Sequence, residues 1–179
     1  PLRLIKYLCF SGLLMMVSCE LSEPVFENPL DREVASNKSI EPPALVFYPD
    51  VIVTNTGSSA ATSVYAMDIE DVGMAEIKIS YDPNKLSISS VAKGDFFQGG
   101  NQPFFISEDD ENGLLIIYVG YLGPNGDSIS GTGNVANIVF NTISAGQSQI
   151  AISSDSKILD SDANAIKLNG YGEGLIDAQ

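Results

Sequence analysis

The sequence contains no histidine and no tryptophan, and these two absences narrow the functions that it can have. Histidine is the commonest general base near neutral pH and the commonest zinc ligand, so most acid–base enzymes and zinc sites are disfavoured. Tryptophan is the usual platform for stacking sugar rings. Tyrosine can take its place, and the chain has seven tyrosines.

Cysteine and basic residues are also scarce. The 179 residues include only Cys9 and Cys19, and nine Lys or Arg stand against 23 Asp or Glu, which gives a formal charge of −14. An acidic surface repels the phosphates of nucleic acids and anionic lipid headgroups. The composition therefore excludes nucleic acid as a partner.

The first 18 residues have the pattern of a bacterial export signal. Arg3 and Lys6 precede an apolar run over residues 7–17, which is too short for a transmembrane helix of about 20 residues. The run ends in Met-Val-Ser-Cys at residues 16–19, which is similar to the lipobox of bacterial lipoproteins. We expect residues 1–18 to be removed and Cys19 to carry lipid, whose acyl chains anchor the protein in a membrane.

Cleavage at this position changes the composition of the mature chain. It removes Cys9, Arg3 and Lys6, so seven basic and 23 acidic residues remain and the formal charge becomes −16. No disulfide or thiolate chemistry is then expected, and the hydrophobic core alone must stabilise the fold. We expect the protein at the cell envelope, in the outer membrane or at the cell surface; the sequence leaves the membrane and leaflet open.

Residues 19–43 are expected to form a flexible tether behind the lipidated cysteine. Proline at positions 24, 29, 42 and 43 and many polar residues disfavour packed structure in this stretch. From residue 44 onward, short apolar runs separated by turn residues replace this polar stretch. We therefore assign residues 44–179 to a single folded domain.

This domain reads as an all-β fold. Residues 75–81 alternate, with apolar Ala75, Ile77, Ile79 and Tyr81 on one side and polar residues on the other, as in a half-buried strand. Other short runs, among them residues 63–67, 86–91, 114–122 and 135–141, are separated by turn residues such as Asn-Gly at 112–113 and 125–126. No helix is indicated. The pattern predicts an antiparallel β-sandwich or jelly roll of about nine strands.

The order of several short motifs resembles that of cohesin domains. Residues 79–86 read Ile-Ser-Tyr-Asp-Pro-Asn-Lys-Leu, and Lys-Gly-Asp-Phe-Phe follows at 93–97. Later, residues 131–140 (Gly-Thr-Gly-Asn-Val-Ala-Asn-Ile-Val-Phe) are similar to the cohesin strand after a Gly-x-Gly turn, and residues 158–172 fit the last hairpin of the family. The resemblance covers about residues 44–179.

The resemblance implies a non-catalytic module that binds dockerin-bearing proteins on one exposed sheet face. Carried over by position, it places Met74, Glu76 and Lys78 on that face, with Glu76 as a hydrogen-bond acceptor, and adds Tyr118 and Tyr121 from the strand at 114–122. Aromatic residues suit such a role because they contribute a large contact area with little entropy loss. Each polar residue is also compatible with an ordinary solvated strand, and Tyr118 with a core position, because residues 114–119 are apolar on both sides.

Two acidic segments allow more than one interpretation. Residues 108–111 (Glu-Asp-Asp-Glu) are either a Ca²⁺ site or, more commonly, a solvated hairpin tip. Residues 160–164 (Asp-Ser-Asp-Ala-Asn) begin like a calcium loop, but Ala165 and Tyr171 stand where that loop needs glycine and glutamate. A polar turn is the better interpretation, and no metal or other cofactor is assigned.

The sequence leaves two binding functions as alternatives, protein binding and carbohydrate binding. No nucleophile with a neighbouring base and no phosphate-binding loop is present, so we do not expect an enzyme. The first hypothesis is a protein-binding cohesin, and the alternative is a carbohydrate-binding module that binds polysaccharide at the cell surface or in the environment. A flat face around Glu76 and Tyr118 would favour the first, and a groove or a row of exposed tyrosines the second.

Overall fold

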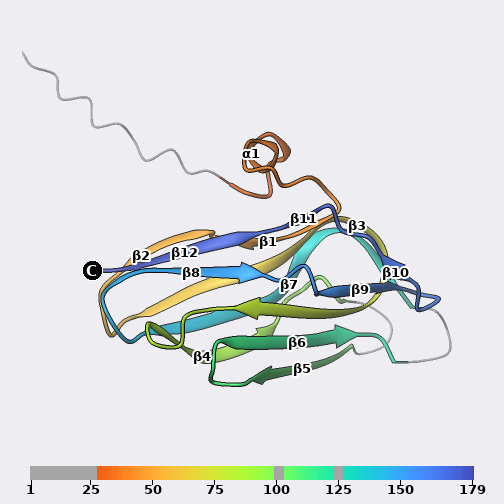
Figure 1. The fold of residues 1–179 in the computed structure, drawn as a ribbon. Coiled ribbons are helices and arrows are strands. Elements are labelled where there is room, and N and C mark those ends of the chain that lie inside the picture. Colours follow the sequence, from red (N-terminus) through yellow and green to blue (C-terminus); the bar gives the residue numbers. More distant parts are fainter. Residues whose placement is uncertain (1–27, 99–102, 123–126) are drawn as a thin grey trace, which may run out of the picture.

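The computed structural model describes residues 28–98, 103–122 and 127–179 (Figure 1). The predicted signal peptide, Cys19, the first part of the predicted tether and the turn at residues 123–126 lie outside these ranges. Within the described ranges, no helix has the length and apolar character needed to span a bilayer.

Strands dominate the described chain, and one short helix precedes them. The elements are α1 (Arg32–Asn37), β1 (Ala44–Tyr48), β2 (Val51–Thr54), β3 (Ser59–Ser80), β4 (Leu86–Lys93), β5 (Phe104–Asp109), β6 (Leu114–Gly120), β7 (Ile129–Thr142), β8 (Gly146–Ile152), β9 (Lys157–Asp160), β10 (Ala165–Ile166), β11 (Gly170–Tyr171) and β12 (Glu173–Ala178). The predicted β-sandwich class is confirmed. The described chain has more strands than the nine or so that the sequence predicts, because some are divided into shorter segments.

Strand β3 belongs to both layers of the sandwich. Its first half pairs with β1 and β7, and its second half pairs with β6 and β9. Strands β4 and β5 extend the two layers, since β4 pairs with β7 and β5 with β6. The prediction of separate strands at 63–67 and 75–81 is therefore wrong, because residues 63–67 and 75–80 belong to one 22-residue strand. This strand bends between the layers at irregularities in its pairing with β7.

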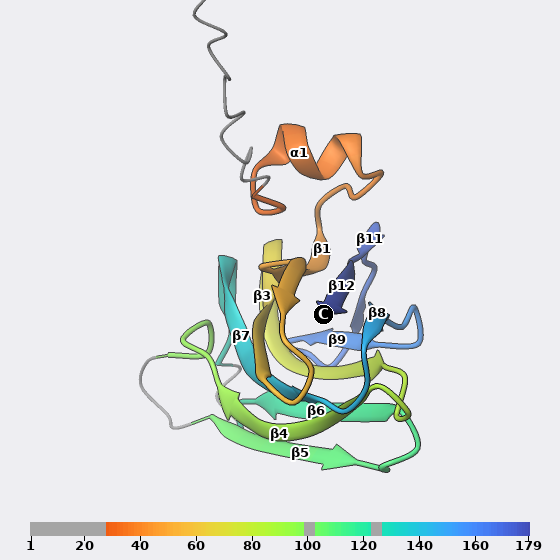
Figure 2. The same cartoon turned by 90° about the vertical axis from the view of Figure 1, so that its left-hand side faces the viewer.

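The end of the chain closes the sandwich beside β3. Strand β8 pairs with the end of β3 and with β12, and β12 also pairs with β2. The β12–β2 and β1–β11 pairings are parallel, while the other pairings are antiparallel. Figures 1 and 2 show β5 and β6 at the end of the molecule opposite α1.

The core lies between the layers and is apolar. Its largest fully buried side chains include Phe47, Phe97, Phe140, Ile77 and Ile117. The ring of Tyr81 packs edge-on against Phe140 with centroids 5.9 Å apart, and its hydroxyl donates a hydrogen bond of 2.7 Å to Asp109. Tight apolar packing of this kind supplies most of the stability of a domain without disulfides.

The expectation of an unpacked tether up to residue 43 is wrong for its described part. Asp31 caps α1 by accepting hydrogen bonds from the backbone of Glu33 and Val34, and the helix buries Ala35 completely. Ala35 packs with Ala44, Val46 and Met67 in a small second cluster, which Leu30, Ile40 and Tyr65 flank. The proline and polar content that favours a tether does not reveal this packing, because a single buried alanine leaves no periodic signal.

Replacing Ala35 by glutamate should detach this segment from the sandwich. A buried carboxylate without a partner is unfavourable, so we expect the free energy of unfolding to fall by about 1–3 kcal/mol. Hydrogen exchange should become faster over residues 32–40 while the β3–β7 ladder stays protected. Ser36→Glu, which adds the same charge at an exposed position of α1, is the control and should have little effect. Equal effects of the two variants would contradict the packing described.

Candidate functional site

The second half of β3 presents its polar side chains on one outer face of the sandwich. The residues that point inward, Ala75, Ile77 and Ile79, are at most 1% exposed, while Glu76 and Lys78 between them are partly exposed. The alternation predicted for residues 75–81 is therefore confirmed. We call the outward side of β5, β6, the second half of β3 and β9 the four-strand face.

The strand registers place the outward residues in rows across this face. Glu76 lies opposite Tyr118 on β6 and Lys157 on β9, and Tyr118 lies opposite Ile106 on β5. Directly opposed residues on antiparallel strands point to the same side of a sheet. Ile106, Tyr118, Glu76 and Lys157 thus form one row across all four strands.

Two further rows flank this central row. On one side, Met74 lies opposite Gly120 and Leu159, and Phe104 pairs with Gly120. On the other side, Ile116 lies opposite both Lys78 and Glu108. The face therefore combines a band of apolar side chains with a small set of charged ones.

The charges on the four-strand face compensate one another. The Lys78 ammonium lies 3.1 Å from the Glu76 carboxylate, and both side chains are about one-quarter exposed (27% and 26%). Glu108 and Lys157 balance each other in formal charge. Such an exposed ion pair contributes little to stability, but the face is formally neutral on a chain whose net charge is −14.

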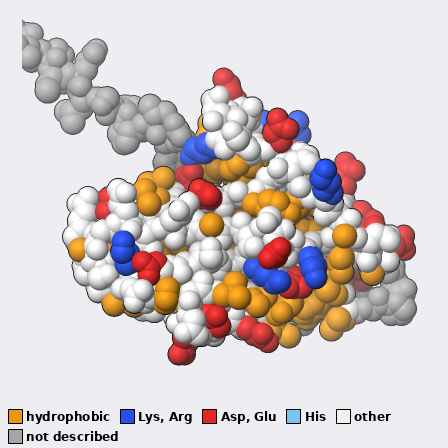
Figure 3. All heavy atoms as spheres, in the orientation of Figure 1, with side chains coloured by type: hydrophobic (Ala, Val, Ile, Leu, Met, Phe, Trp, Pro, Cys, Tyr) orange, Lys and Arg blue, Asp and Glu red, His pale blue; other side chains and the backbone are white. Residues whose placement is uncertain are grey.

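Apolar side chains make up most of the rest of the four-strand face. Ile106 is 52% exposed on β5, and Ile116 and Tyr118 lie beside it on β6. In Figure 3, hydrophobic side chains gather over β5 and β6, and Lys or Arg side chains lie beside them over β3 and β9. An exposed apolar patch bordered by polar groups is typical of a protein interaction surface.

Four of the five predicted partner-binding residues lie on this face, and Tyr121 lies at its edge. Tyr121 follows β6, its ring contacts Phe97 with centroids 5.7 Å apart, and its hydroxyl donates to the Gln98 carbonyl at 3.0 Å. Burial raises the pKa of the Tyr121 hydroxyl, and the nearby Asp127 carboxylate adds to this effect. With Met74 and Leu159 it borders a hollow of about 140 Å³.

The sequence interpretation missed several residues of the four-strand face. Ile106, Ile116, Lys157 and Leu159 are outward because of the register between strands, which no local pattern records. The apolar run of β6 in particular gives no sign of which residues point outward.

Both acidic segments are turns in which an aspartate carboxylate accepts hydrogen bonds from backbone N–H groups of the same turn. The Asp110 carboxylate accepts hydrogen bonds from the backbone of Asn112 at 2.8 Å and Leu114 at 2.9 Å. The Asp160 carboxylate accepts from Asp162 at 2.9 Å and Asn164 at 2.7 Å, which confirms the polar turn predicted there. No group of three or more His, Cys, Asp or Glu side chains within the described ranges is arranged to hold a metal ion.

The fold is that of a β-sandwich module. The family model of the cohesin domain matches residues 48–170, which is more than half of the chain. The protein therefore belongs to the cohesin domain family, whose members are non-catalytic modules that bind dockerins.

Solved cohesin structures share the fold at low sequence identity. A non-cellulosomal cohesin from the archaeon Archaeoglobus fulgidus aligns with a TM-score of 0.59 and 20% identity, covering 76% of this chain and 93% of that one. The third cohesin ScaC of Acetivibrio cellulolyticus, solved with the ScaB dockerin, aligns with a TM-score of 0.63 and 17% identity over 75% and 97%. No curated protein matches the chain significantly.

The register of the four-strand face can be tested through neighbouring residues of β6. Ile117→Ala should lower the free energy of unfolding by about 2–5 kcal/mol because Ile117 is fully buried. Tyr118→Ala should lower it by about 1 kcal/mol or less, because this side chain points outward. Denaturant titration of both variants checks the expectation, and a larger effect at Tyr118 would mean that β6 is shifted by one residue.

Proposed function

We propose that this protein is a lipid-anchored cohesin that captures a dockerin-bearing protein on its four-strand face and catalyses no reaction. The observation that carries the proposal is the combination of exposed apolar residues with compensated charges on an otherwise acidic surface. Such a face can be desolvated without burying a net charge, which is the main electrostatic obstacle to forming an interface.

The four-strand face offers both anchors and polar contacts to such a partner. Tyr118 supplies apolar area near the centre, Ile106 supplies it at the edge on β5, and Glu76 supplies a carboxylate that can accept hydrogen bonds from the partner. The 3.1 Å pair with Lys78 holds this carboxylate in place. Two similar structures support the partner class, since the sixth cohesin of scaffoldin B and the third cohesin ScaC were both solved with dockerins.

The arrangement of the chain suits display on a lipid anchor. Residue 28, where the described chain begins, adjoins α1, and β5 lies at the opposite end of the molecule (Figure 1). Attachment through the N-terminal side therefore leaves the edge of the four-strand face that β5 forms directed away from the anchor. Cohesins are typically extracellular or cell-surface modules, which agrees with the predicted export signal and lipidation at Cys19.

Replacement of exposed apolar residues at two distant positions of the sheet should separate binding from stability. Ile106→Ala should weaken binding to a dockerin from the same organism about tenfold or more, because it removes an exposed anchor. Val53→Ala on β2 is the matched control: Val53 is 62% exposed, comparable to Ile106 at 52%, but β2 is separated from β3 by β8 and β12 and lies outside the four-strand face. Calorimetric titration measures both, and Glu76→Ala should behave like Ile106→Ala.

Equal dockerin affinities of the Ile106→Ala and Val53→Ala variants would mean that the partner binds elsewhere on the protein. Absence of binding to every dockerin of the organism would refute the partner class. Retention on insoluble polysaccharide, lost in the Tyr118→Ala variant, would instead favour the carbohydrate-binding alternative. Tyr118 is the single tyrosine among the outward residues of the four strands, all of which are described.

Lipid attachment can be tested through Cys19 alone. Cys19→Ala should abolish incorporation of labelled fatty acid and shift the protein from the membrane fraction to the aqueous fraction, because its acyl chains would be missing. Cys9→Ala is the control and should retain the label, since residue 9 precedes the expected cleavage point. Labelling of the Cys19 variant would show that the export signal is of another type.

A further inference from the structure

A second concave region lies between the N-terminal segment and the sandwich. The cavity has a volume of about 400 Å³ and is lined by residues 38–40 on one side and by β1, β11 and β12 on the other. Its volume falls at the lower end of the range for small-ligand sites. The docked α1 segment forms one wall, so the cavity exists because Ala35 and Ile40 hold this segment in place.

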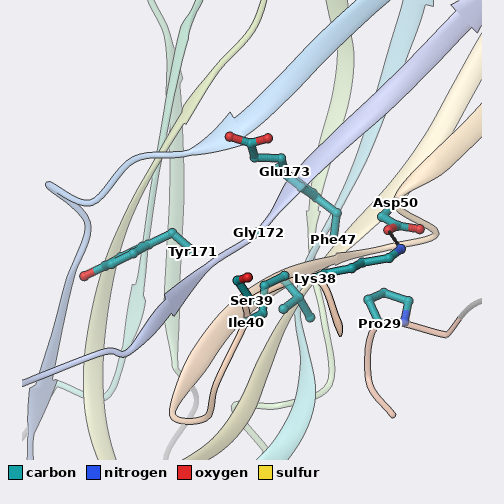
Figure 4. A pocket seen from close by; sticks show the side chains of 10 residues that line it. Pro29, Lys38, Ser39, Ile40, Phe47, Asp50, Tyr171, Gly172 and Glu173 are labelled. Carbon is teal, nitrogen blue, oxygen red and sulfur yellow. Dashed lines mark hydrogen bonds and ion pairs between the residues drawn. The ribbon is translucent and has the colours of Figure 1, made fainter. Parts of the chain in front are cut away.

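Positively and negatively charged side chains line the cavity. The Lys38 ammonium lies 2.5 Å from the Asp50 carboxylate at one end, and the side chains are 30% and 15% exposed. Figure 4 shows Glu173 and Tyr171 on other sides, with the Tyr171 ring extending away from the Lys38–Asp50 pair. A ligand in the cavity would thus meet both hydrogen-bond donors and hydrogen-bond acceptors.

The backbone at Gly172 brings two strands close together beside the cavity. The Gly172 backbone N–H donates to the Leu45 carbonyl at 2.7 Å, and a Cβ at this position would come within 2.8 Å of the Val46 Cα. Only glycine fits here without displacing β1. Tyr171 and Glu173 on either side of Gly172 are therefore held on a fixed backbone.

The cavity continues into a second hollow along the outer surface of β12. This hollow has a volume of about 230 Å³, shares Asp50 and Glu173 with the first, and adds Gln149, Leu175 and Val51. The Gln149 amide donates to the Glu173 carboxylate at 2.7 Å, which orients both groups. Together the two hollows form a groove that is longer than a single small ligand requires.

The chemistry of this groove selects among ligand classes. An anionic ligand would meet Asp50 and Glu173 on a chain of net charge −14. An apolar ligand would bury the Lys38–Asp50 pair without replacing its hydration. A neutral polyhydroxylated ligand fits best, because its hydroxyls can donate to the Asp50 and Glu173 carboxylates and accept from Lys38 and Gln149.

We propose that this groove binds a neutral oligosaccharide. The groove adjoins the four-strand face on the same sheet, because Ser80 on β3 pairs with Ala151 on β8, and Ala151 pairs with Glu173 on β12. A saccharide in the groove and a protein on the four-strand face would therefore lie side by side on one surface of the module. The inference rests on the groove and stands apart from the proposed dockerin binding.

The test uses the purified full chain in a sugar-free detergent. An array of neutral glycans identifies bound oligosaccharides, and calorimetry then measures the affinity for the best of them. We expect Glu173→Ala and Gln149→Ala each to weaken this affinity about tenfold or more, because both side chains line the groove. Asp177→Ala is the matched control for Glu173: Asp177 also lies on β12 and accepts from a β8 glutamine, Gln147, but it does not line the groove.

The outcomes separate this proposal from the dockerin assignment. Glu76→Ala should leave saccharide affinity unchanged, and Glu173→Ala should leave dockerin affinity unchanged. No binding to any neutral glycan on the array would overturn the proposal, as would equal affinities of the Glu173 and Asp177 variants. Loss of dockerin binding in Glu173→Ala would show that the groove is a protein contact instead. Near-wild-type unfolding of Glu173→Ala, whose side chain is exposed, guards against misfolding.

Discussion

The bend of strand β3 is the constraint on which the rest of the structure depends. The strand leaves one layer and joins the other through irregularities near Asp68 and Asp71, both of which have positive φ angles of 48° and 57°. Aspartate tolerates this conformation better than most residues. Hydroxyls of β7 satisfy the freed backbone groups, since Asp68 N–H donates to Thr132 at 3.0 Å and Asp71 N–H to Ser130 at 2.8 Å. The bend fixes where the second half of β3, and with it Glu76, meets β6 and β9.

The sequence predicts the class of fold and the orientation of β3 because both depend on local alternation. Ala75, Ile77 and Ile79 alternate with polar residues, and a half-buried strand follows directly. It does not reveal that β3 is one strand, because the bend at Asp68 and Asp71 looks like a polar turn. It also misses α1, whose six residues are held by the Asp31 cap and by packing of Ala35, and not by an amphipathic pattern.

The candidate site is predictable only in part for the same physical reason. The outward positions of Met74, Glu76 and Lys78 can be predicted from the alternation of one strand. Ile106 and Lys157 lie on the four-strand face because of pairing between strands that are distant in the sequence. Charge compensation is a property of the assembled face and is invisible in the composition, which is strongly acidic. The placement of Tyr121 at the edge, against Phe97, likewise reflects the end of β6 at Gly120.

Methyl-resolved NMR of the protein with a bound dockerin tests the central claim most directly. If the four-strand face is the binding surface, the methyl signals of Ile106, Ile116 and Met74 should shift on binding, while those of Val51 and Val53 on β2 should not. Shifts confined to Val51 and Val53, with Ile106 and Ile116 unchanged, would contradict the assignment of the four-strand face.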